Sequence, residues 1–280
     1  MEPITLPPAF DPGGVAVVTG GAGGIGFAIA ARFAAMGLKV VIADLPGEPL
    51  EAAGRELAKG GEVAAIAADV SSDADIARLR DAVHQRHGPV AVLINNAAIG
   101  GNPGKPWENP SGWEQLLRIN LMGVIGVAQA FVPAMVAGDR PGVIVNTGSK
   151  QGITSPPGNA AYNLSKAGVR SYTESLAHAL REETAGRIAA HLLIPGFTHT
   201  GMTGSGEKPA GAWTADQVAG FMLESIARGD FYILCPDNDV DRATDEKRMR
   251  WAMDDIIANR PALSRWHPDY KDAFARYMAE

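Results

Sequence analysis

Short apolar runs alternate with longer Ala-rich stretches along the chain, and this alternation constrains the fold more than any other feature. The apolar runs, rich in β-branched residues, lie at 15–19, 39–44, 62–68, 90–95, 142–147, 187–194 and 231–234. The stretches with the apolar spacing of helices lie near 24–36, 48–59, 73–87, 111–138, 158–184 and 214–228. Most of the apolar runs are continuous, which is typical of strands covered by helices on both faces. The alternation therefore predicts a single doubly wound α/β fold with a parallel sheet of about seven strands.

The length and composition fit one such domain followed by a segment of another kind. The chain has 280 residues, of which 46% are hydrophobic, and this is enough for one large core. We predict that the doubly wound domain spans 1–235 and includes a substrate lid near 196–213. Residues 236–280 are richer in charge and carry several aromatic side chains. We expect this C-terminal extension to be mostly helical and to pack on the same domain or on a partner subunit.

The charge balance argues against two classes of partner. The net charge is −6, and charges of both signs are mixed along the chain, which disfavours nucleic acid and an anionic membrane surface. The single cysteine, Cys235, excludes an internal disulfide framework and suits a reducing, cytoplasmic location. The first residues, MEPITLPPAFDP, lack a basic segment and a long apolar segment, so we expect no signal peptide and no membrane span. His84 and His87 lie on an Arg-rich stretch without a carboxylate at ligand spacing, so we expect no metal site.

The residues just after each predicted strand are the candidates for ligand binding, because ligands bind beyond the carboxyl ends of parallel strands. The first strand is followed by 19-TGGAGGIG-26 and then by a helix. Glycines in such a turn let backbone N–H groups approach a pyrophosphate, and the helix N-terminus adds partial positive charge. The candidate phosphate-binding residues are Gly20, Gly24, Ile25 and Gly26.

An acidic residue at the end of the second strand predicts the choice of cofactor. Asp44 stands 18 residues beyond Gly26 and is followed by Leu45. A carboxylate there accepts hydrogen bonds from both ribose hydroxyls of NAD and repels a 2′-phosphate. No Arg or Lys lies in the glycine turn or directly after Asp44, so NAD is favoured over NADP; the alternative is that Asp44 only ends the strand and caps a turn. Asp69 and Val70 follow the third strand and are placed to contact adenine, although such an Asp is more often a helix N-cap.

Polar residues also follow the fourth and fifth predicted strands. After the fourth, 95-NNAAIG-100 leaves room for a flat ring, and its Asn amides can tie neighbouring strands together. Asn120 lies in a helical stretch although Asn is a poor helix former; it is either functional or a buried amide that satisfies local backbone. Ser149 follows the fifth strand, and Tyr162 and Lys166 share one face of the next helix. Because Lys is rarely buried without a partner, this pair either lies on an exposed face or lines a site.

In this order, the motifs resemble the short-chain dehydrogenase/reductase family with its TGxxxGxG and YxxxK signatures. The match runs in register from Val15 to Gly196 and more loosely to Leu234. The cofactor-binding candidates that it covers are Gly20, Gly24, Ile25, Gly26, Asp44, Leu45, Asp69, Val70, Asn96, Ala97, Ala98, Tyr162, Lys166, Pro195, Gly196, Thr198 and Thr200. The resemblance implies a Rossmann-type dehydrogenase domain, a small-molecule substrate, and a homodimer or homotetramer packed through helices 111–138 and 158–184. Together with Asp44, it indicates an NAD-preferring member.

The resemblance also implies the roles of four residues. Tyr162 is the general acid/base, Lys166 lowers its pKa and binds the nicotinamide ribose, Ser149 holds the substrate oxygen, and Asn120 supports a water in a proton relay. The chemistry itself points the same way, because an alcohol that gives up a hydride must also lose its hydroxyl proton to a base. A neighbouring ammonium and the positive nicotinamide both favour the phenolate form of a tyrosine.

Two residues depart from the family pattern. Ala98 stands where Gly is usual, and Lys150 follows Ser149 where a small residue is more ordinary. We expect Lys150 to point to solvent at the strand end. The alternatives are that it pairs with an acidic group of the substrate or with an acid of the C-terminal extension.

The predicted substrate pocket is mainly apolar. Its candidate residues are Ser149, Gln151, Ile153, Tyr162, Phe197 and Met202. The sequence thus predicts an NAD-dependent oxidoreductase that transfers a hydride between nicotinamide and an apolar or aromatic secondary alcohol or ketone. One alternative is a non-catalytic NAD-binding sensor or scaffold, and another is an NADPH-dependent carbonyl or acyl reductase, which Asp44 disfavours. A serine hydrolase is excluded because 148-GSKQG-152 centres on Lys150.

Overall fold

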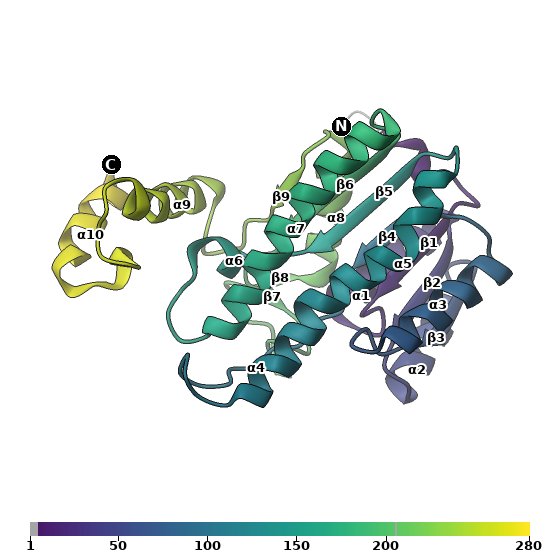
Figure 1. Ribbon diagram of the computed structural model, residues 1–280, viewed down its shortest axis with the longest axis horizontal. Helices are drawn as coiled ribbons and strands as arrows, with labels where there is room; N and C mark the ends of the chain where they lie inside the picture. Colours follow the sequence, from purple (N-terminus) through teal and green to yellow (C-terminus); the bar gives the residue numbers. More distant parts are fainter. Residues whose placement is uncertain (1–4, 205) are drawn as a thin grey trace.

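A seven-stranded parallel sheet forms the centre of the computed structural model, which describes residues 5–204 and 206–280 (Figure 1). The strand order is β3-β2-β1-β4-β5-β6-β9. The strands are β1 (Val15–Thr19), β2 (Lys39–Asp44), β3 (Val63–Ala67), β4 (Val90–Asn95), β5 (Gly142–Thr147), β6 (Ile188–Ile194) and β9 (Tyr232–Leu234). Neighbouring strands in this sheet are parallel, which confirms the predicted doubly wound α/β fold. The first residues of the N-terminal segment and residue 205 of the predicted lid lie outside the described residues.

Helices connect the strands, and most of them begin and end close to where the sequence places them. They are α1 (Gly24–Ala35), α2 (Glu48–Leu57), α3 (Asp73–Arg86), α4 (Pro110–Leu117), α5 (Gly123–Ala137), α6 (Gln151–Thr154), α7 (Ala160–Thr184), α8 (Ala215–Ala227), α9 (Arg242–Ile257) and α10 (Lys271–Ala279). Shorter turns of helix are η1 (Pro8–Phe10), the π-helical η2 (Arg118–Met122), η3 (Ser264–Trp266) and η4 (Pro268–Tyr270). A separate two-stranded sheet joins β7 (Thr198–His199) to β8 (Trp213–Thr214).

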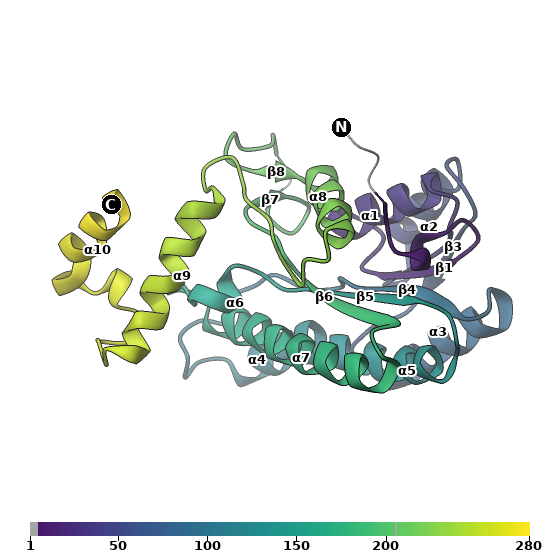
Figure 2. The same ribbon diagram turned by 90° about the horizontal axis from the view of Figure 1, so that it is seen from above.

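The continuous apolar strands feed two cores, one on each face of the sheet. Side chains alternate along a strand, so Val18 of β1 joins the core under α1, α2 and α8, while Val17 joins the core under α3, α5 and α7. Figure 2 shows these helices in two layers on opposite faces of the sheet. Phe33 of α1 and Phe131 of α5 are fully buried, one in each core. The sheet is therefore rigid up to the strand ends where the candidate site residues begin.

The run from Pro110 to Ala137 is long and apolar enough, by length and composition, to cross a membrane. Its packing explains this composition, because Val127, Phe131 and Met135 of α5 lie in the core beneath the sheet. The run is not one regular helix, since η2 interrupts it with a π-helical turn that contains Asn120. Such turns often occur at functional sites.

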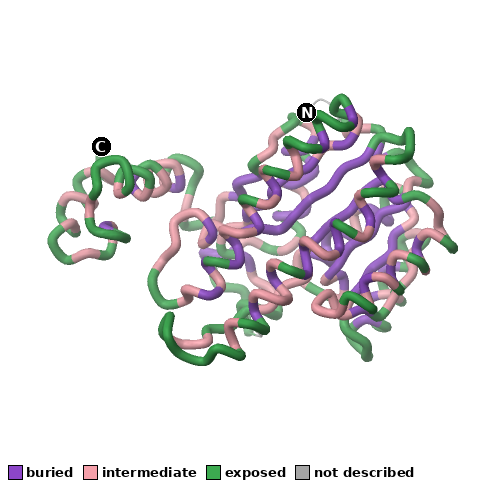
Figure 3. The backbone as a smooth tube through the Cα atoms, in the orientation of Figure 1, coloured by how far each residue is buried: buried purple, intermediate pink, exposed green. Residues whose placement is uncertain are grey.

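The C-terminal extension leaves the body of the molecule as an arm (Figure 1). Its first helix, α9, contacts the short helix α6 near the site, and Figure 3 shows that much of the arm beyond is exposed or half-buried. The arm has a small centre of its own, where the ring of Trp251 lies 5.2 Å from that of Phe274 and 5.2 Å from that of Tyr277. The Trp251 indole donates a hydrogen bond of 2.8 Å to Ser264 Oγ.

Truncating Phe131 should destabilise the whole domain, because its ring is fully buried between α5 and the sheet. We expect Phe131→Ala to lower the free energy of unfolding by about 3–5 kcal/mol. Urea denaturation measures this, with Trp107→Ala as the control, since Trp107 is 77% exposed and its loss should change stability by less than about 0.5 kcal/mol. Equal losses for both variants would contradict the core assignment.

Candidate active site

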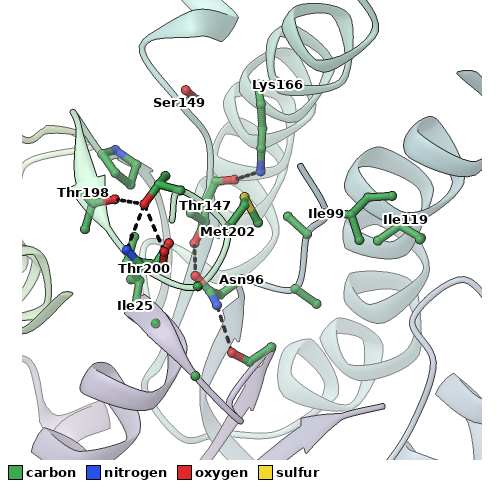
Figure 4. A pocket seen from close by; sticks show the side chains of 18 of the residues that line it. Ile25, Asn96, Ile99, Ile119, Thr147, Ser149, Lys166, Thr198, Thr200 and Met202 are labelled. Carbon is green, nitrogen blue, oxygen red and sulfur yellow. Dashed lines mark hydrogen bonds between the residues drawn. The ribbon is translucent and has the colours of Figure 1, made fainter. Parts of the chain in front are cut away.

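A cleft of about 590 Å³ runs along the carboxyl ends of the strands. It gathers most of the predicted site residues: Gly20, Gly24, Ile25, Asp44, Leu45, Asp69, Val70, Asn96, Ala97, Ala98, Ser149, Gln151, Tyr162, Lys166, Pro195, Gly196, Phe197, Thr198, Thr200 and Met202. Three predicted residues do not line it, namely Gly26, Asn120 and Ile153. Figure 4 shows Thr198 and Thr200 on one side of the cleft and Ile99 and Ile119 on the other.

The glycine turn after β1 is shaped by close backbone contacts. Gly20 has a φ of +66°, which favours glycine, and a Cβ on it would lie 2.8 Å from Ala97 Cα. A Cβ on Gly26 would lie 2.1 Å from the Gly20 carbonyl oxygen, so Gly26 lets α1 pack onto the turn and does not itself line the cleft. The N-cap of α1, Gly23, makes no side-chain hydrogen bond. The first N–H groups of α1 therefore remain available to an anion such as a pyrophosphate.

Asp44 is fixed at the rim of the glycine turn. One carboxylate oxygen accepts a hydrogen bond of 3.0 Å from the Ala22 N–H, and the other accepts one of 2.8 Å from the Leu45 N–H. Each oxygen keeps a second lone pair for a ribose hydroxyl. Among the described residues that line the cleft, the cations are Lys150 and Lys166, and both lie at the opposite end. No cation in the described lining therefore offsets the charge of Asp44 near a 2′-phosphate.

Asp69 lines the cleft beside Val70, and it does not cap the following helix. Its carboxylate accepts a hydrogen bond of 2.8 Å from the Ser71 N–H. The N-cap of α3 is Ser72, whose hydroxyl accepts from the Asp75 N–H. The N-cap alternative for Asp69 is thus not what the structure shows.

Asparagine side chains tie the strand ends together, as the sequence predicts. Asn95 of β4 donates a buried hydrogen bond of 2.8 Å to Asn146 of β5. The Asn96 N–H donates to Thr19 Oγ1 at 3.0 Å, and its amide donates to the Gly20 carbonyl at 3.3 Å. These bonds hold the glycine turn and the ends of β4 and β5 in one fixed arrangement.

At the reacting end of the cleft, Lys166 of α7 is buried and Tyr162 of the same helix is half-buried. Lys166 is 2% exposed, and its ammonium donates a hydrogen bond of 2.8 Å to the Thr147 carbonyl (Figure 4). The ammonium lies 5.7 Å from the centre of the Tyr162 ring. Burial lowers the pKa of Lys166 from 10.5 to about 8. Burial raises the pKa of Tyr162, and a hydrogen bond with the Ser149 side chain acts in the opposite direction. The pair therefore lines the site, and the exposed-face alternative is excluded.

Asn120 lies behind the cleft wall. Its side-chain oxygen accepts a hydrogen bond of 2.8 Å from the Ile99 N–H, and its side-chain nitrogen donates one of 2.9 Å to the Ile99 carbonyl. The amide is fully buried, and it fixes the segment that follows β4. Its role in a proton relay stays a prediction.

The structure also shows where the sequence misplaced a residue or missed one. Ile153 packs into a third cluster around Val169 and does not line the cleft. Thr203 is not among the residues that the sequence predicts for the site, yet it lines the cleft. Its hydroxyl accepts a hydrogen bond from the Thr200 N–H at 2.9 Å and donates one to the Thr198 carbonyl at 2.8 Å. No local pattern marks Thr203, because its role depends on how the loop folds back on itself.

The expectation that Lys150 points to solvent is wrong. Its ammonium lies 3.2 Å from a carboxylate oxygen of Asp237 and 2.6 Å from one of Asp245, and its side chain is 19% exposed. The alternative of a pair with an acid of the C-terminal extension is what the structure shows. The reason is that β5 and β9 end at the same edge of the sheet, where the extension begins.

The cleft fits a nicotinamide dinucleotide. The glycine turn and Asp44 stand at one end, and Ser149, Tyr162 and Lys166 at the other. Between them, Ala97 and Ala98 leave space beside the strand ends. Within 5–204 and 206–280, no group of three or more His, Cys, Asp or Glu side chains is arranged to hold a metal ion.

Comparisons with known proteins agree with this geometry. The family model described as short chain dehydrogenase matches residues 14–210. The 1-deoxy-11-beta-hydroxypentalenate dehydrogenase of Streptomyces exfoliatus is 36% identical over 226 residues, which are 78% of this chain and 81% of that protein.

Solved structures are similar as well, with different cofactors bound. A short-chain dehydrogenase/reductase from Burkholderia phymatum in complex with NAD has a TM-score of 0.81 and 32% identity, covering 90% of this chain and 97% of that one. A metagenomic short-chain oxidoreductase in complex with NADP has a TM-score of 0.67 and 31% identity, covering 81% and 98%.

Replacing Lys166 should change how stability depends on pH. The folded pKa of about 8 lies below the ordinary 10.5, so between these values the unfolded chain binds a proton that the folded protein has lost. Stability from this group therefore rises with pH above about 8. Relative to Lys166→Met, the wild type should gain about 1 kcal/mol of unfolding free energy between pH 7 and pH 9.

Urea denaturation of the cofactor-free protein at the two pH values measures this gain. Lys59→Met is the matched control, because Lys59 lies in the turn after α2 with its side chain 71% exposed, and it should show no such gain. A difference between wild type and Lys166→Met that stays constant with pH would contradict the lowered pKa.

Proposed function

Because the chain belongs to the short-chain dehydrogenase family, we propose that it is an NAD-dependent oxidoreductase that transfers a hydride between nicotinamide and a secondary alcohol or ketone. The observation that carries this proposal is the meeting of Ser149, Tyr162 and Lys166 at the end of a cleft that begins at the glycine turn. Bound NAD supplies the hydride acceptor. The residues of the protein then have to orient the alcohol and remove its hydroxyl proton.

Tyr162 and Ser149 share the alcohol oxygen in this proposal. The Tyr162 phenolate takes the hydroxyl proton at Oη as the carbon–hydrogen bond gives up its hydride. Ser149 Oγ accepts a hydrogen bond of 3.2 Å from the Gln151 N–H. Its single O–H, which is in hydrogen-bond contact with Tyr162 in the structure, turns to the substrate oxygen when the alcohol binds. This second bond orients the alcohol and stabilises developing negative charge.

Lys166 supports the phenolate. One of its three N–H donors is held by the Thr147 carbonyl, and the other two are free for the nicotinamide ribose. Burial alone raises the pKa of Tyr162, so the lowering has to come from the Lys166 ammonium, the Ser149 hydrogen bond and the positive charge of the cofactor. Alcohol oxidation should accordingly speed up with rising pH as the phenol loses its proton, up to about pH 8, where Lys166 begins to lose the charge that supports the phenolate.

In this proposal Asn120 acts through its backbone carbonyl. Both polar groups of its amide are bonded to Ile99, so a water in a proton relay would contact the Asn120 carbonyl instead. The π-helical turn that contains Asn120 departs from the regular i to i−4 pattern of carbonyl bonding, which supports this assignment.

The preference for NAD rests on Asp44. Its carboxylate is fixed by two backbone N–H groups and faces the site of the ribose. Relatives of known structure bind either cofactor, so the rival is an NADPH-dependent carbonyl or acyl reductase. A non-catalytic sensor is less well supported, because it would have no need of Tyr162, Lys166 and Ser149 in one site.

The substrate proposed is apolar or aromatic. Ile99, Ile119, Phe197 and Met202 line the cleft near its reacting end. We further propose a cytoplasmic homodimer or homotetramer that packs through the α4–α5 and α7 helices. Leu164 of α7 is 51% exposed, and an exposed apolar side chain on this helix supports that packing.

The basic test is NADH absorbance over time, with NAD or NADP and a panel of aliphatic and aromatic secondary alcohols.

In that assay Tyr162→Phe should lower kcat by roughly 10²–10⁴-fold, because the proton acceptor is lost. Calorimetry should find its NAD affinity little changed. Tyr172→Phe is the matched control, since Tyr172 lies on the same helix and packs into the third cluster. Retained turnover in Tyr162→Phe would remove this residue from its role.

Replacing Asp44 should change the choice of cofactor. Asp44→Ala loses charge-assisted hydrogen bonds to ribose and should weaken NAD binding by about tenfold or more. It should also raise the affinity for NADP relative to that for NAD, because the carboxylate no longer repels a 2′-phosphate. Asp81→Ala, on the exposed side of α3, should leave both affinities unchanged. A wild type that already prefers NADP would refute the assignment of Asp44.

A further inference from the structure

A turn after β9 holds one end of the segment 196–213. Asp237 Oδ2 accepts a hydrogen bond of 3.1 Å from the Phe197 N–H. Its other carboxylate oxygen accepts from the N–H groups of Asp239 at 3.1 Å and Val240 at 2.8 Å. One side chain therefore shapes the turn 237–240 and fixes the point where the chain leaves Gly196 and enters the cleft wall.

The same turn holds the other end of that segment. The Asn238 N–H donates to the Gly211 carbonyl at 3.0 Å, and its amide donates to the Ala210 carbonyl at 2.7 Å. The two ends also meet directly, because the Trp213 N–H donates to the Phe197 carbonyl at 2.9 Å. The segment is thus a loop closed at its base by the turn 237–240.

Lys150 connects this base to the catalytic strand end. It follows Ser149 in the chain, and its ammonium reaches Asp237 at 3.2 Å and Asp245, in the first turn of α9, at 2.6 Å. The contact is tight, because a Cβ on Gly196 would lie 2.9 Å from the Lys150 nitrogen and 2.6 Å from Asp237 Oδ2.

These three charges are well shielded from water. The carboxylate side chains are 6% and 7% exposed, and the lysine is 19% exposed. Breaking a buried ion pair by removing one partner leaves an uncompensated charge, which is strongly unfavourable. The cluster therefore has one favourable arrangement, and in it the base of the loop, α9 and the strand end are held together.

We propose that Lys150 is a positioning residue that, through Asp237 and Asp245, holds the loop 196–213 at the substrate end of the cleft and thereby sets the affinity for the alcohol. The proposal rests on the proposed function for its kinetic meaning. Phe197 and Met202, the apolar side chains of this loop that line the cleft, are the means by which it acts. Met202 reaches across to the segment after β4, where a Cβ on Gly100 would lie 3.1 Å from its Cγ.

Kinetics of matched variants test the proposal. Lys150→Met should raise KM for the alcohol about tenfold or more, while kcat and the Kd of NAD change by less than about threefold. Lys150→Arg keeps the charge and should restore most of the affinity. Lys59→Met, in the exposed turn after α2, is the control. A purely structural role for Lys150 would lower the melting temperature without raising KM, and that outcome would overturn the proposal.

Hydrogen exchange gives a readout that does not depend on turnover. In Lys150→Met, the backbone amides of Phe197, Asp239 and Val240 should exchange at least about tenfold faster than in the wild type, because their bonds to Asp237 are loosened. Amides of β1 and β4 should be unaffected. Unchanged exchange at Phe197, Asp239 and Val240 would overturn the proposal whether or not the wild type oxidises an alcohol. A wild type that oxidises no alcohol would count against the proposed function only.

A second variant covers the case in which Lys150→Met fails to fold. Asp245→Asn keeps the pair between Lys150 and Asp237 and removes one buried carboxylate, so it should fold. It should raise KM less than Lys150→Met does and should speed exchange in α9. An Asp245→Asn protein with unaltered KM and unaltered exchange in α9 would contradict the link between the extension and the loop.

Discussion

The catalytic arrangement depends on one buried cation, the Lys166 ammonium. It is removed from water and has the Thr147 carbonyl as its hydrogen-bond partner at 2.8 Å. Burial disfavours the charged form, which is why its pKa falls to about 8. The ammonium lies 5.7 Å from the centre of the Tyr162 ring, and in the proposed reaction the same absence of water strengthens its attraction for the phenolate. Burying Lys166 thus costs folding stability, and it provides an electrostatic field at Tyr162 that a solvent-exposed lysine would not provide.

Such a field is useful only if the strand ends stay in place. The bonds from Asn95 to Asn146 and from Asn96 to Thr19 cross the sheet where neighbouring strands end. They join the phosphate-binding turn of β1 to the strand β5 that carries Thr147. The proposed cofactor-binding end and the proposed proton-transfer end of the cleft therefore share one hydrogen-bonded frame, and Asn120 extends that frame to Ile99.

Sequence reasoning predicted what local pattern determines. Continuous apolar runs predicted the parallel sheet, and position at the end of a strand predicted that Asp44 and Ser149 line one cleft. Tyr162 was placed there by its helix spacing to Lys166 and by the family resemblance. It failed where contacts join distant parts of the chain. Lys150 and Asp237 are 87 residues apart, and no local sequence pattern around either residue predicts that the two are in contact. Ile153 was misplaced for a related reason, because the short helix α6 turns its side chain into the third cluster.

The boundary predicted at residue 235 follows composition, and the ion cluster crosses it. Lys150 belongs to the sheet domain, while Asp237 and Asp245 belong to the extension. A chain ending at 235 would leave the lysine without either carboxylate and the loop 196–213 without the turn that closes its base. A buried charge without a partner is unfavourable enough to rearrange its surroundings. By this argument the beginning of the extension belongs to the candidate active site, and only the arm beyond α9 is an addition to the sheet domain.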